Sequence, residues 1–428
     1  MGHGRWRELY MVPAHLRKTR ELLFNGLMII YPLLAELVFR TGAAFGPADS
    51  WWEAVGGSQH WTQEPPLEGK TIWMHCASLG EFEMGRPVLE QFLDRHEHWQ
   101  AVVTFFSPSG YEQRKLYARA KVHYLPFDRP SLVKKWLAYV QPDLALMVRY
   151  DLWPNHIAGL RRANVPVVVM GMSASRTPWY LSRVLPLIRK NFMDGVHTWG
   201  VVSETDSACM SMAGVHSQVL GNPKYDYAAA VVGAEANEKF TAWKRAQQKP
   251  VLLVGSAHLS DCEALNGLDL RAYSLWVVPH ELKESSKVRE ALMQYEASQV
   301  LDSTRDEPKA TDVLMVPEFG VLVSLYGLAD GVVVGGGWGK STHNVLEATA
   351  QRKIAACGPN WQKIAENKEL VEGGFLQPIQ SHEDWAQYLD QVGTEALVAK
   401  GKAAQAWMLE QRGAAEKIVK VLEEAVQL

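Results

Sequence analysis

The chain has 428 residues, more than one ordinary hydrophobic core accommodates, so two domains are expected. Hydrophobic residues make up 47% and charged residues 21% of the chain, as in folded globular proteins. The formal net charge of -3 argues against a strongly basic nucleic-acid-binding protein, and no nucleic-acid partner is expected. The scattered cysteines form no CxxC pair, which argues against a disulfide framework or a zinc site and favours a reducing compartment; they are Cys76, Cys209, Cys262 and Cys357.

Near the N-terminus, residues 22–39 form an apolar run, LLFNGLMIIYPLLAELVF, with basic residues on both sides. A helix of about 18 residues spans roughly 27 Å, barely the thickness of a hydrocarbon core. Glu36 would be costly in the middle of a bilayer. We therefore expect residues 1–45 to associate with a membrane, by a helix that lies in the interface or spans the bilayer. A buried amphipathic helix of the first domain is the alternative.

After residue 50, short apolar runs alternate with stretches of helical spacing, which is the βαβ pattern of a parallel sheet. The first series of expected strands reads TIWMHCA, AVVTFF, KVHYLPF, LALMVRY and VPVVVMGM. A second series begins near residue 250 and reads PVLLVGSA, YSLWVVPH, DVLMVP, GVVVGGG and KIAACG. We predict an α/β protein with two Rossmann-like domains, 46–225 and 226–428, the second including the C-terminal helices. A ligand would bind in a cleft between the carboxyl ends of the two sheets.

In the first domain, WMHCASLGEF places Ser78, Gly80 and Glu81 where an expected strand gives way to a helix. A carboxylate at the mouth of a sheet is well placed to act as a general base, which is the role predicted for Glu81. The alternative is a carboxylate that only complements the dipole of the following helix.

Two further strand ends of the first domain carry polar residues. The stretch TFFSPSG places Ser107 in a second strand-to-helix turn, and VRYDLWPN places Arg149 and Asp151 at a strand end. A guanidinium group such as that of Arg149 recognises carboxylates and phosphates. The alternative is an ion pair of Arg149 that only holds loops together.

In the second domain, residues 333–347 read VVGGGWGKSTHNVLE, an apolar strand that runs into glycines. Gly335, Gly336 and Gly337 would allow backbone amides to approach an anion, and a helix expected from about His343 would add its dipole. This pattern predicts a phosphate-binding loop, with a tight strand-to-helix turn as the alternative. Glu347, about one turn into the helix, could accept hydrogen bonds from ribose hydroxyls.

Two other strand ends of this domain carry histidines. GSAH contains Ser256 and His258, and the next expected strand ends at Pro279 and His280. A single histidine at a strand end is more often structural than catalytic. Two histidines that converge on one cleft favour a binding role.

Taken in order, these blocks resemble those of the Kdo (3-deoxy-D-manno-octulosonic acid) transferases of lipopolysaccharide synthesis. The resemblance runs from Trp73 to about Leu370 through ASLGEFEMGRP, TFFSPSGYE, YLPFD, VRYDLWPN, GNPKYD, GSAH, VPHE, LYGLADGVVVGGG, HNVLEA and CGPNWQK. It implies a GT-B fold and an inverting glycosyltransferase at the cytoplasmic side of the inner membrane. The implied reaction moves Kdo from CMP-Kdo to a glucosamine hydroxyl of a lipid A precursor.

The resemblance also implies residue roles. Glu81 matches the proposed catalytic base of the family, and Lys224 lies in the GNxKxD block with Asn222. The predicted donor-binding residues are Lys224, Ser256, His258, Pro279, His280, Gly335, Gly336, Gly337, His343, Asn344 and Glu347. The predicted acceptor-binding residues are Ser78, Gly80, Ser107, Arg149 and Asp151. Candidates for contact with acceptor phosphates are Arg86, Lys115 and Arg176, each with solvated surface as its alternative.

The chain departs from the family pattern at several positions. Many members have a glutamate where Arg149 stands, Pro279 and His280 replace a Pro-Arg-His triplet, and Ser341 and Thr342 replace a second glycine. These departures leave open another nucleotide-sugar donor, or a catalytically impaired membrane-associated binding protein. An NAD dehydrogenase is disfavoured because no strand–GxGxxG–helix unit is present.

No metal or other cofactor is expected in the reaction. CMP-Kdo carries a single phosphate and is already activated, and no Asp-x-Asp cluster stands at a strand end.

Overall fold

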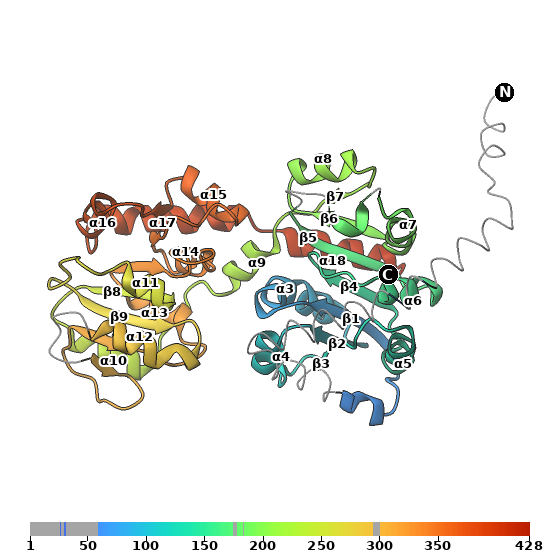
Figure 1. Cartoon of the computed structure of the whole chain (residues 1–428), viewed down its shortest axis with the longest axis horizontal. Coiled ribbons are helices and arrows are strands. Elements are labelled where there is room, and N and C mark those ends of the chain that lie inside the picture. The colour runs from blue at the N-terminus through green and yellow to red at the C-terminus, as the bar shows by residue number, and fades with distance from the viewer. Residues whose placement is uncertain (1–25, 27–29, 31–58, 174–177, 183, 294–299) are drawn as a thin grey trace, which may run out of the picture. The chain divides into compact units, whose positions relative to one another are not determined.

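The computed structural model describes residues 59–173, 178–182, 184–293 and 300–428, together with Gly26 and Ile30. They form two compact units (Figure 1). The first unit combines Met1–Asp226 with Gly413–Leu428, and the second is Tyr227–Arg412. Almost all of the expected membrane-associating segment lies outside the described residues. Within the described part of the chain, no helix has the length and apolar character needed to cross a membrane.

The first unit contains a seven-stranded parallel sheet with the order β3-β2-β1-β4-β5-β6-β7. The chain enters at the central strand β1, builds outward to β3, and returns to the other side of β1 at β4. The carboxyl ends of β1, β2 and β4 are therefore neighbours at the point where the strand order reverses. The strands are β1 (Lys70–Cys76), β2 (Trp99–Phe105), β3 (Lys121–Tyr124), β4 (Leu144–Val148), β5 (Val167–Met172), β6 (Thr198–Val201) and β7 (Gln218–Val219).

Helices cover both faces of this sheet, so alternate residues of a strand enter two different cores. Trp73 packs into one core, whereas its neighbours Ile72 and Met74 pack into the other. The helices are α3 (Leu79–Arg95), α4 (Pro108–Arg114), α5 (Pro130–Val140), α6 (Pro154–Arg162), α7 (Pro186–Gly195) and α8 (Glu204–Met212), with the short 3-10 helices η2 (Gln59–Gln63) and η3 (Trp179–Leu181).

The last helix, α18 (Ala414–Ala425), packs on the first unit, contrary to the prediction that the second domain includes all C-terminal helices. Its apolar stripe, which includes Ile418 and Leu422, is buried in the same core as Ile72 and Met74. His96 on the loop after α3 also pairs with Glu423 at 3.1 Å. Burial of this stripe explains the placement, because an amphipathic helix joins the core that can cover its apolar face.

The second unit contains a seven-stranded parallel sheet with the order β10-β11-β9-β8-β12-β13-β14. Here the strand order reverses at β8, which lies between β9 and β12. The strands are β8 (Val251–Ala257), β9 (Ser274–Pro279), β10 (Val300–Asp302), β11 (Val313–Met315), β12 (Gly331–Val334), β13 (Ala355–Cys357) and β14 (Leu376–Pro378). The prediction of two parallel-sheet α/β domains is thus confirmed.

Helices again flank the sheet of the second unit, as Figure 1 shows. The helix α9 (Pro223–Ala230) contains the division between the two units, at Asp226 and Tyr227. The others are α10 (Glu238–Ala246), α11 (Leu259–Glu263), η4 (Leu282–Glu284), α12 (Ser285–Leu292), α13 (Leu322–Leu328), α14 (Leu346–Ala350), α15 (Ala365–Glu372), α16 (His382–Leu389) and α17 (Glu395–Glu410).

The packing of α18 generates a stability prediction. We expect Leu422→Ala to destabilise the first unit by about 2–5 kcal/mol, because it removes a fully buried side chain from a packed core. Hydrogen exchange at the amides of β1 measures the effect. The control is Glu424→Ala on the exposed side of the same helix. Equal protection of β1 in both variants would contradict the assignment of α18 to this core.

Candidate functional site

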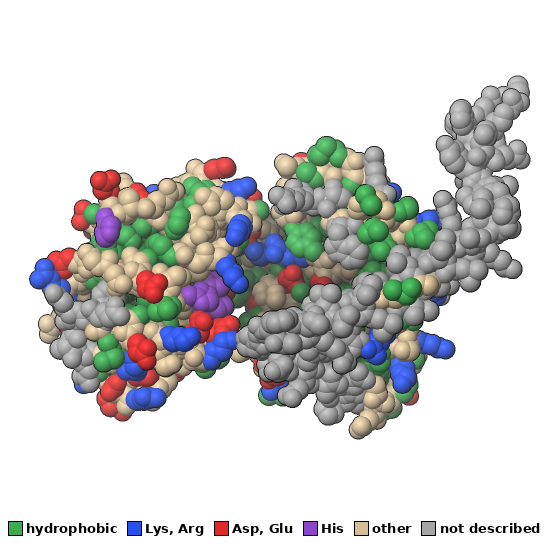
Figure 2. Space-filling view, viewed as in Figure 1, with side chains coloured by type: hydrophobic (Ala, Val, Ile, Leu, Met, Phe, Trp, Pro, Cys, Tyr) green, Lys and Arg blue, Asp and Glu red, His purple; other side chains and the backbone are tan. Residues whose placement is uncertain are grey.

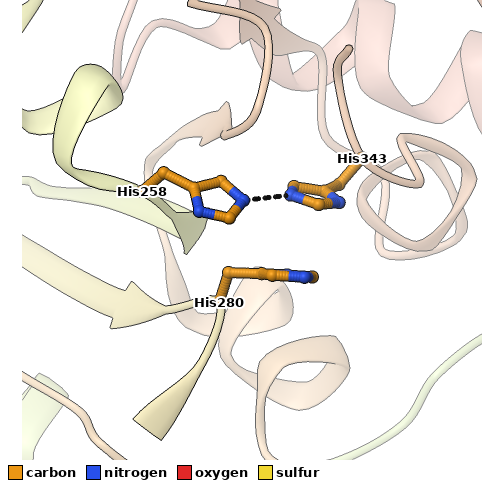
Figure 3. A group of neighbouring side chains, drawn as sticks. All are labelled: His258, His280 and His343. Atoms are coloured by element: carbon orange, nitrogen blue, oxygen red, sulfur yellow. Dashed lines mark hydrogen bonds between the residues drawn. The ribbon is translucent and has the colours of Figure 1, made fainter. Parts of the chain in front are cut away.

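Three neighbouring strands of the second sheet each deliver a histidine at their carboxyl ends (Figure 3). His258 follows β8 at the start of α11, His280 directly follows β9, and His343 lies in the loop after β12. One ring nitrogen from each histidine lies within 4.8 Å of those of the other two. The sequence predicted that His258 and His280 converge, and the structure adds His343 to the same cluster.

The rings of this cluster are in direct contact. Nε2 of His258 and Nε2 of His343 share a hydrogen bond at 3.0 Å, in which one ring donates and the other accepts. The ring of His280 stacks on that of His343, with centroids 4.0 Å apart and planes inclined by 18°. Nδ1 of His258 lies 3.2 Å from a carboxylate oxygen of Glu284.

The glycine-rich loop after β12 packs closely against its neighbours. A Cβ atom on Gly335 would overlap the carbonyl oxygen of Ser256, and one on Gly337 would lie 2.6 Å from the amide nitrogen of Gly358. Gly336 adopts φ +84°, which strongly favours glycine. The glycines therefore allow three loops to meet. The helix that follows, α14, begins at Leu346, three residues later than expected from the sequence.

Two amides of the loop already have partners within the protein. The amide of Gly335 donates to the carbonyl of Gly255 at 2.8 Å. The amide of Gly336 donates to Oδ2 of Asp261, also at 2.8 Å. These bonds fix the path of the loop beside the histidines.

Asp261 is a residue that the sequence reasoning missed. Its side chain is 1% exposed, and Oδ2 accepts the amide of His258 at 2.8 Å as well as that of Gly336. One buried carboxylate thus joins the end of β8 to the loop after β12. The signal was available, because an acid three residues after a helix N-cap is the pattern of a capping box.

The other predicted donor residues divide between the units. Oε1 of Glu347 accepts the hydroxyl of Tyr227 at 2.8 Å and the side-chain amide of Asn344 at 3.2 Å. Ser256 adopts φ +52°, a left-handed conformation that is uncommon for a residue other than glycine. Pro279 ends β9 beside this site. Lys224 lies in the first unit, where its amide donates to the side chain of Asn222 at 3.2 Å.

In the first unit, Glu81 lies in the first turn of α3, directly after β1. Its Oε2 accepts the amide of Ala77 at 2.6 Å. The carbonyl of Ala77 in turn accepts the amide of Ser107 at 2.8 Å, which brings the turn after β2 to the same place. The turn after β1, with Ser78 and Gly80, therefore lies next to the turn that contains Ser107.

The third strand at this edge is β4, which supplies Arg149 and Asp151. Arg149 adopts φ +65° at the end of the strand. Asp151 accepts a hydrogen bond from Nε2 of His75 at 2.9 Å, and Nδ1 of His75 contacts the hydroxyl of Thr104 at 2.9 Å. His75 is a second residue that the sequence reasoning missed; it lies within the quoted block but on the strand, not at its end.

Of the three candidate cations for acceptor phosphates, two are placed by the structure and both have acidic partners. Arg86 donates to Glu83 at 2.9 Å, and Lys115 donates to Glu112 at 2.7 Å. Arg176 lies outside the described residues.

Comparison with known proteins identifies proteins that this chain resembles. Residues 49–227 match the family model described as 3-deoxy-D-manno-octulosonic-acid transferase (kdotransferase). A Kdo transferase of Haemophilus influenzae is 26% identical over 379 residues, 84% of this chain and 87% of that protein. A Kdo transferase of Chlamydia pneumoniae is 27% identical over 362 residues, 79% of this chain and 82% of that protein. Over most of its length, the chain is thus similar to Kdo transferases.

The resemblance inferred from the sequence is therefore confirmed. A bifunctional glycosyltransferase/methyltransferase of Fusobacterium nucleatum is 23% identical over 340 residues, and the match spans about half of that protein, 53%. Among solved structures, Staphylococcus aureus MnaA with UDP aligns with a TM-score of 0.56 at 14% identity, over 84% of this chain and 97% of that one. A glycosyltransferase of Rickettsia africae aligns with a TM-score of 0.55 at 13% identity, over 84% of this chain and all of that one. These likenesses show the fold, two parallel-sheet α/β domains as in GT-B enzymes.

Burial shifts the pKa values of titratable groups in both candidate regions. It lowers the pKa of His343 to about 3, with further lowering by His280 and His258. Burial likewise lowers the pKa of His280, so both rings are neutral at neutral pH. For Glu81, burial is the largest cause and the charge of Asp151 the second, and together they raise the pKa above the ordinary value for glutamate. The Ala77 amide and Arg149 oppose this rise in the pKa of Glu81.

The double hydrogen bond to Asp261 generates a second prediction. We expect Asp261→Ala to destabilise the loop after β12 by about 1–3 kcal/mol, because two buried amides lose their acceptor. The measurement is hydrogen exchange at the amides of Gly336 and His258. Glu263→Ala, which changes an exposed acid on the same helix, is the control. If both amides stay as protected in Asp261→Ala as in Glu263→Ala, Asp261 does not hold the loop.

Proposed function

We propose that the protein transfers Kdo from CMP-Kdo to a glucosamine hydroxyl of a lipid A precursor, with inversion at the transferred carbon. The observation that carries this proposal is the position of Glu81. The carboxylate lies at the carboxyl edge of the first sheet, within the residues that match the Kdo-transferase family model. The Kdo transferases among the relatives, which align over most of the chain, support the same activity.

The first unit supplies the base for the acceptor. The hydroxyl proton of the acceptor moves to Glu81 while the hydroxyl oxygen bonds to the transferred carbon of Kdo. The bond from that carbon to the phosphate of CMP breaks, and the phosphate leaves with the bonding electrons. The Ala77 amide holds one carboxylate oxygen of Glu81 in place, which orients the other toward the acceptor. Ser78, Gly80, Ser107, Arg149 and Asp151 form the surrounding acceptor site.

The second unit holds the donor at the carboxyl ends of β8, β9 and β12. Glu347 and Asn344 would contact the ribose, while Ser256, His258, His280 and His343 line the phosphate side together with the glycine-rich loop. The resemblance also assigns Lys224, in the GNxKxD block, to donor binding. Because CMP is a competent leaving group, we assign no metal to the transfer step itself.

We further propose that the enzyme works at the cytoplasmic side of the inner membrane. The apolar run at residues 22–39, with basic residues on both sides, supports this location. A lipid A precursor is itself held in the membrane, so an enzyme that associates with the surface meets its acceptor there.

The role of Glu81 generates a test of the proposed function. We expect Glu81→Gln to reduce transfer of Kdo by about 10²–10⁴-fold, because the variant cannot take up the acceptor proton. Product mass is measured with CMP-Kdo and a tetraacylated lipid A precursor, and CMP binding is measured by calorimetry. Glu97→Gln, an exposed position after α3, is the control. Normal turnover by Glu81→Gln with intact CMP binding would rule out this base.

Tighter binding of UDP than of CMP would indicate a different donor.

The pKa of Glu81 generates a pH prediction. In Asp151→Asn one cause of the raised pKa is absent, and the acid limb of kcat/KM, where Glu81 becomes protonated, should move to lower pH. Asp94→Asn, at an exposed carboxylate of α3, is the control. An acid limb that stays in place or moves to higher pH in Asp151→Asn would contradict this electrostatic coupling.

A further inference from the structure

The three histidines of the second unit are suited to a ligand that none of the comparisons names. His258, His280 and His343 stand on adjacent strand ends, and one ring nitrogen of each lies within 4.8 Å of the others. Figure 3 shows the rings of His258 and His343 joined by a hydrogen bond, with the ring of His280 stacked against that of His343. We propose that they bind a divalent transition-metal ion of the zinc class, with an open coordination position.

The distances are close to those that such an ion requires. A tetrahedral zinc site has metal–nitrogen bonds of about 2.0–2.1 Å, which places the ligand nitrogens about 3.3 Å apart. The two Nε2 atoms of His258 and His343 are already 3.0 Å apart. The widest separation, up to 4.8 Å, closes by a side-chain shift of about 1.5 Å.

A carboxylate orients the first of these ligands. Glu284 lies 3.2 Å from Nδ1 of His258, so the N–H of that ring is directed to the carboxylate and its Nε2 lone pair is directed to the cluster. Metal-binding histidines commonly have such a carboxylate partner, which fixes both the tautomer and the ring orientation. The amide of His258 is also anchored, by Asp261 at 2.8 Å. The ligand is therefore positioned before an ion arrives.

The chemistry of the donor set selects the ion. Three imidazoles suit zinc, cobalt, nickel or copper, whereas Mg²⁺ and Ca²⁺ require oxygen ligands. An anion held by protonated rings is the other occupant to consider. Three imidazolium groups packed this closely would repel one another, so the cluster offers lone pairs and not positive charge. Figure 2 shows histidine side chains at the surface of the second unit, and the side chain of His258 is 32% exposed, so an ion can reach this ligand from solvent.

The third imidazole of the cluster comes from His280, which directly follows β9. Where the Kdo-transferase pattern has Pro-Arg-His, this sequence has Pro279 followed by His280. An arginine at this place would bring a permanent positive charge and no lone pair, and it would exclude a cation. We expected no metal in the reaction because CMP-Kdo carries a single phosphate and is already activated, and because no Asp-x-Asp cluster stands at a strand end. Neither reason excludes an imidazole site.

The test uses the full chain without a histidine tag. The protein is titrated with Co²⁺ and, separately, with Zn²⁺, and the solution contains no nucleotide. We expect one Co²⁺ per chain, with the intense visible absorption of a four-coordinate ion, displaced by Zn²⁺ but not by excess Mg²⁺. His280→Ala should lose this absorption, whereas His216→Ala, at an exposed histidine of the first unit, should retain it. Circular dichroism verifies that each variant is folded.

A second pair of variants keeps all three ligands and tests the orienting carboxylate. We expect Glu284→Gln to weaken Zn²⁺ binding by about 10–100-fold. Glu281→Gln, at a nearby carboxylate that pairs with Lys283, should leave the affinity within a few-fold of the parent. Absence of a Co²⁺ complex would overturn the proposal. A Zn²⁺ affinity that stays unchanged in both His280→Ala and Glu284→Gln would also overturn the proposal. Because no sugar donor or acceptor is present, failure here is distinct from failure of the proposed transfer activity.

Discussion

The structure depends on one constraint, the parallel pairing of strands that run outward in both directions from a central strand. In each sheet the first strand of the chain lies in the interior, between two strands that are distant from each other in sequence. In the first sheet β1 lies between β2 and β4, and in the second sheet β8 lies between β9 and β12. Parallel pairing places all their carboxyl ends at one edge, so the loops that follow must share the same space. Residues from three separate loops therefore meet in each unit.

Hydrogen bonds between these loops keep the meeting points rigid. In the first unit the peptide of Ala77 links Glu81 to Ser107, because its amide and its carbonyl each bond to one of them. In the second unit, buried Asp261 performs the same task for His258 and Gly336. Both links use backbone groups at strand ends, which would otherwise lack partners. The side chains proposed to act in chemistry are thus held by residues that take no part in it.

The two edges differ in their electrostatics. At the first, burial and Asp151 raise the pKa of Glu81, and Arg149 and the Ala77 amide oppose the rise, which favours a carboxylate that exchanges protons. At the second, burial lowers the pKa of His280 and His343 and leaves neutral rings. The raised pKa of Glu81 and the lowered pKa values of the two histidines therefore have the same main physical cause, desolvation, which acts on groups of opposite charge type.

The sequence by itself determined the two parallel α/β domains and which residues stand at the strand ends, because periodicity and turn chemistry are local properties. Glu81, His258, His280 and His343 were all found in this way. Tertiary structure alone decided that the three histidines touch, because their contact depends on strand order, which local sequence does not encode. It also decided that α18 returns to the first unit, because an apolar stripe does not specify which core will bury it. The sequence carried a capping-box signal for the bond of Asp261 to His258, but the bond of Asp261 to Gly336 and the bond of His75 to Asp151 join residues distant in sequence and became visible only in the folded chain.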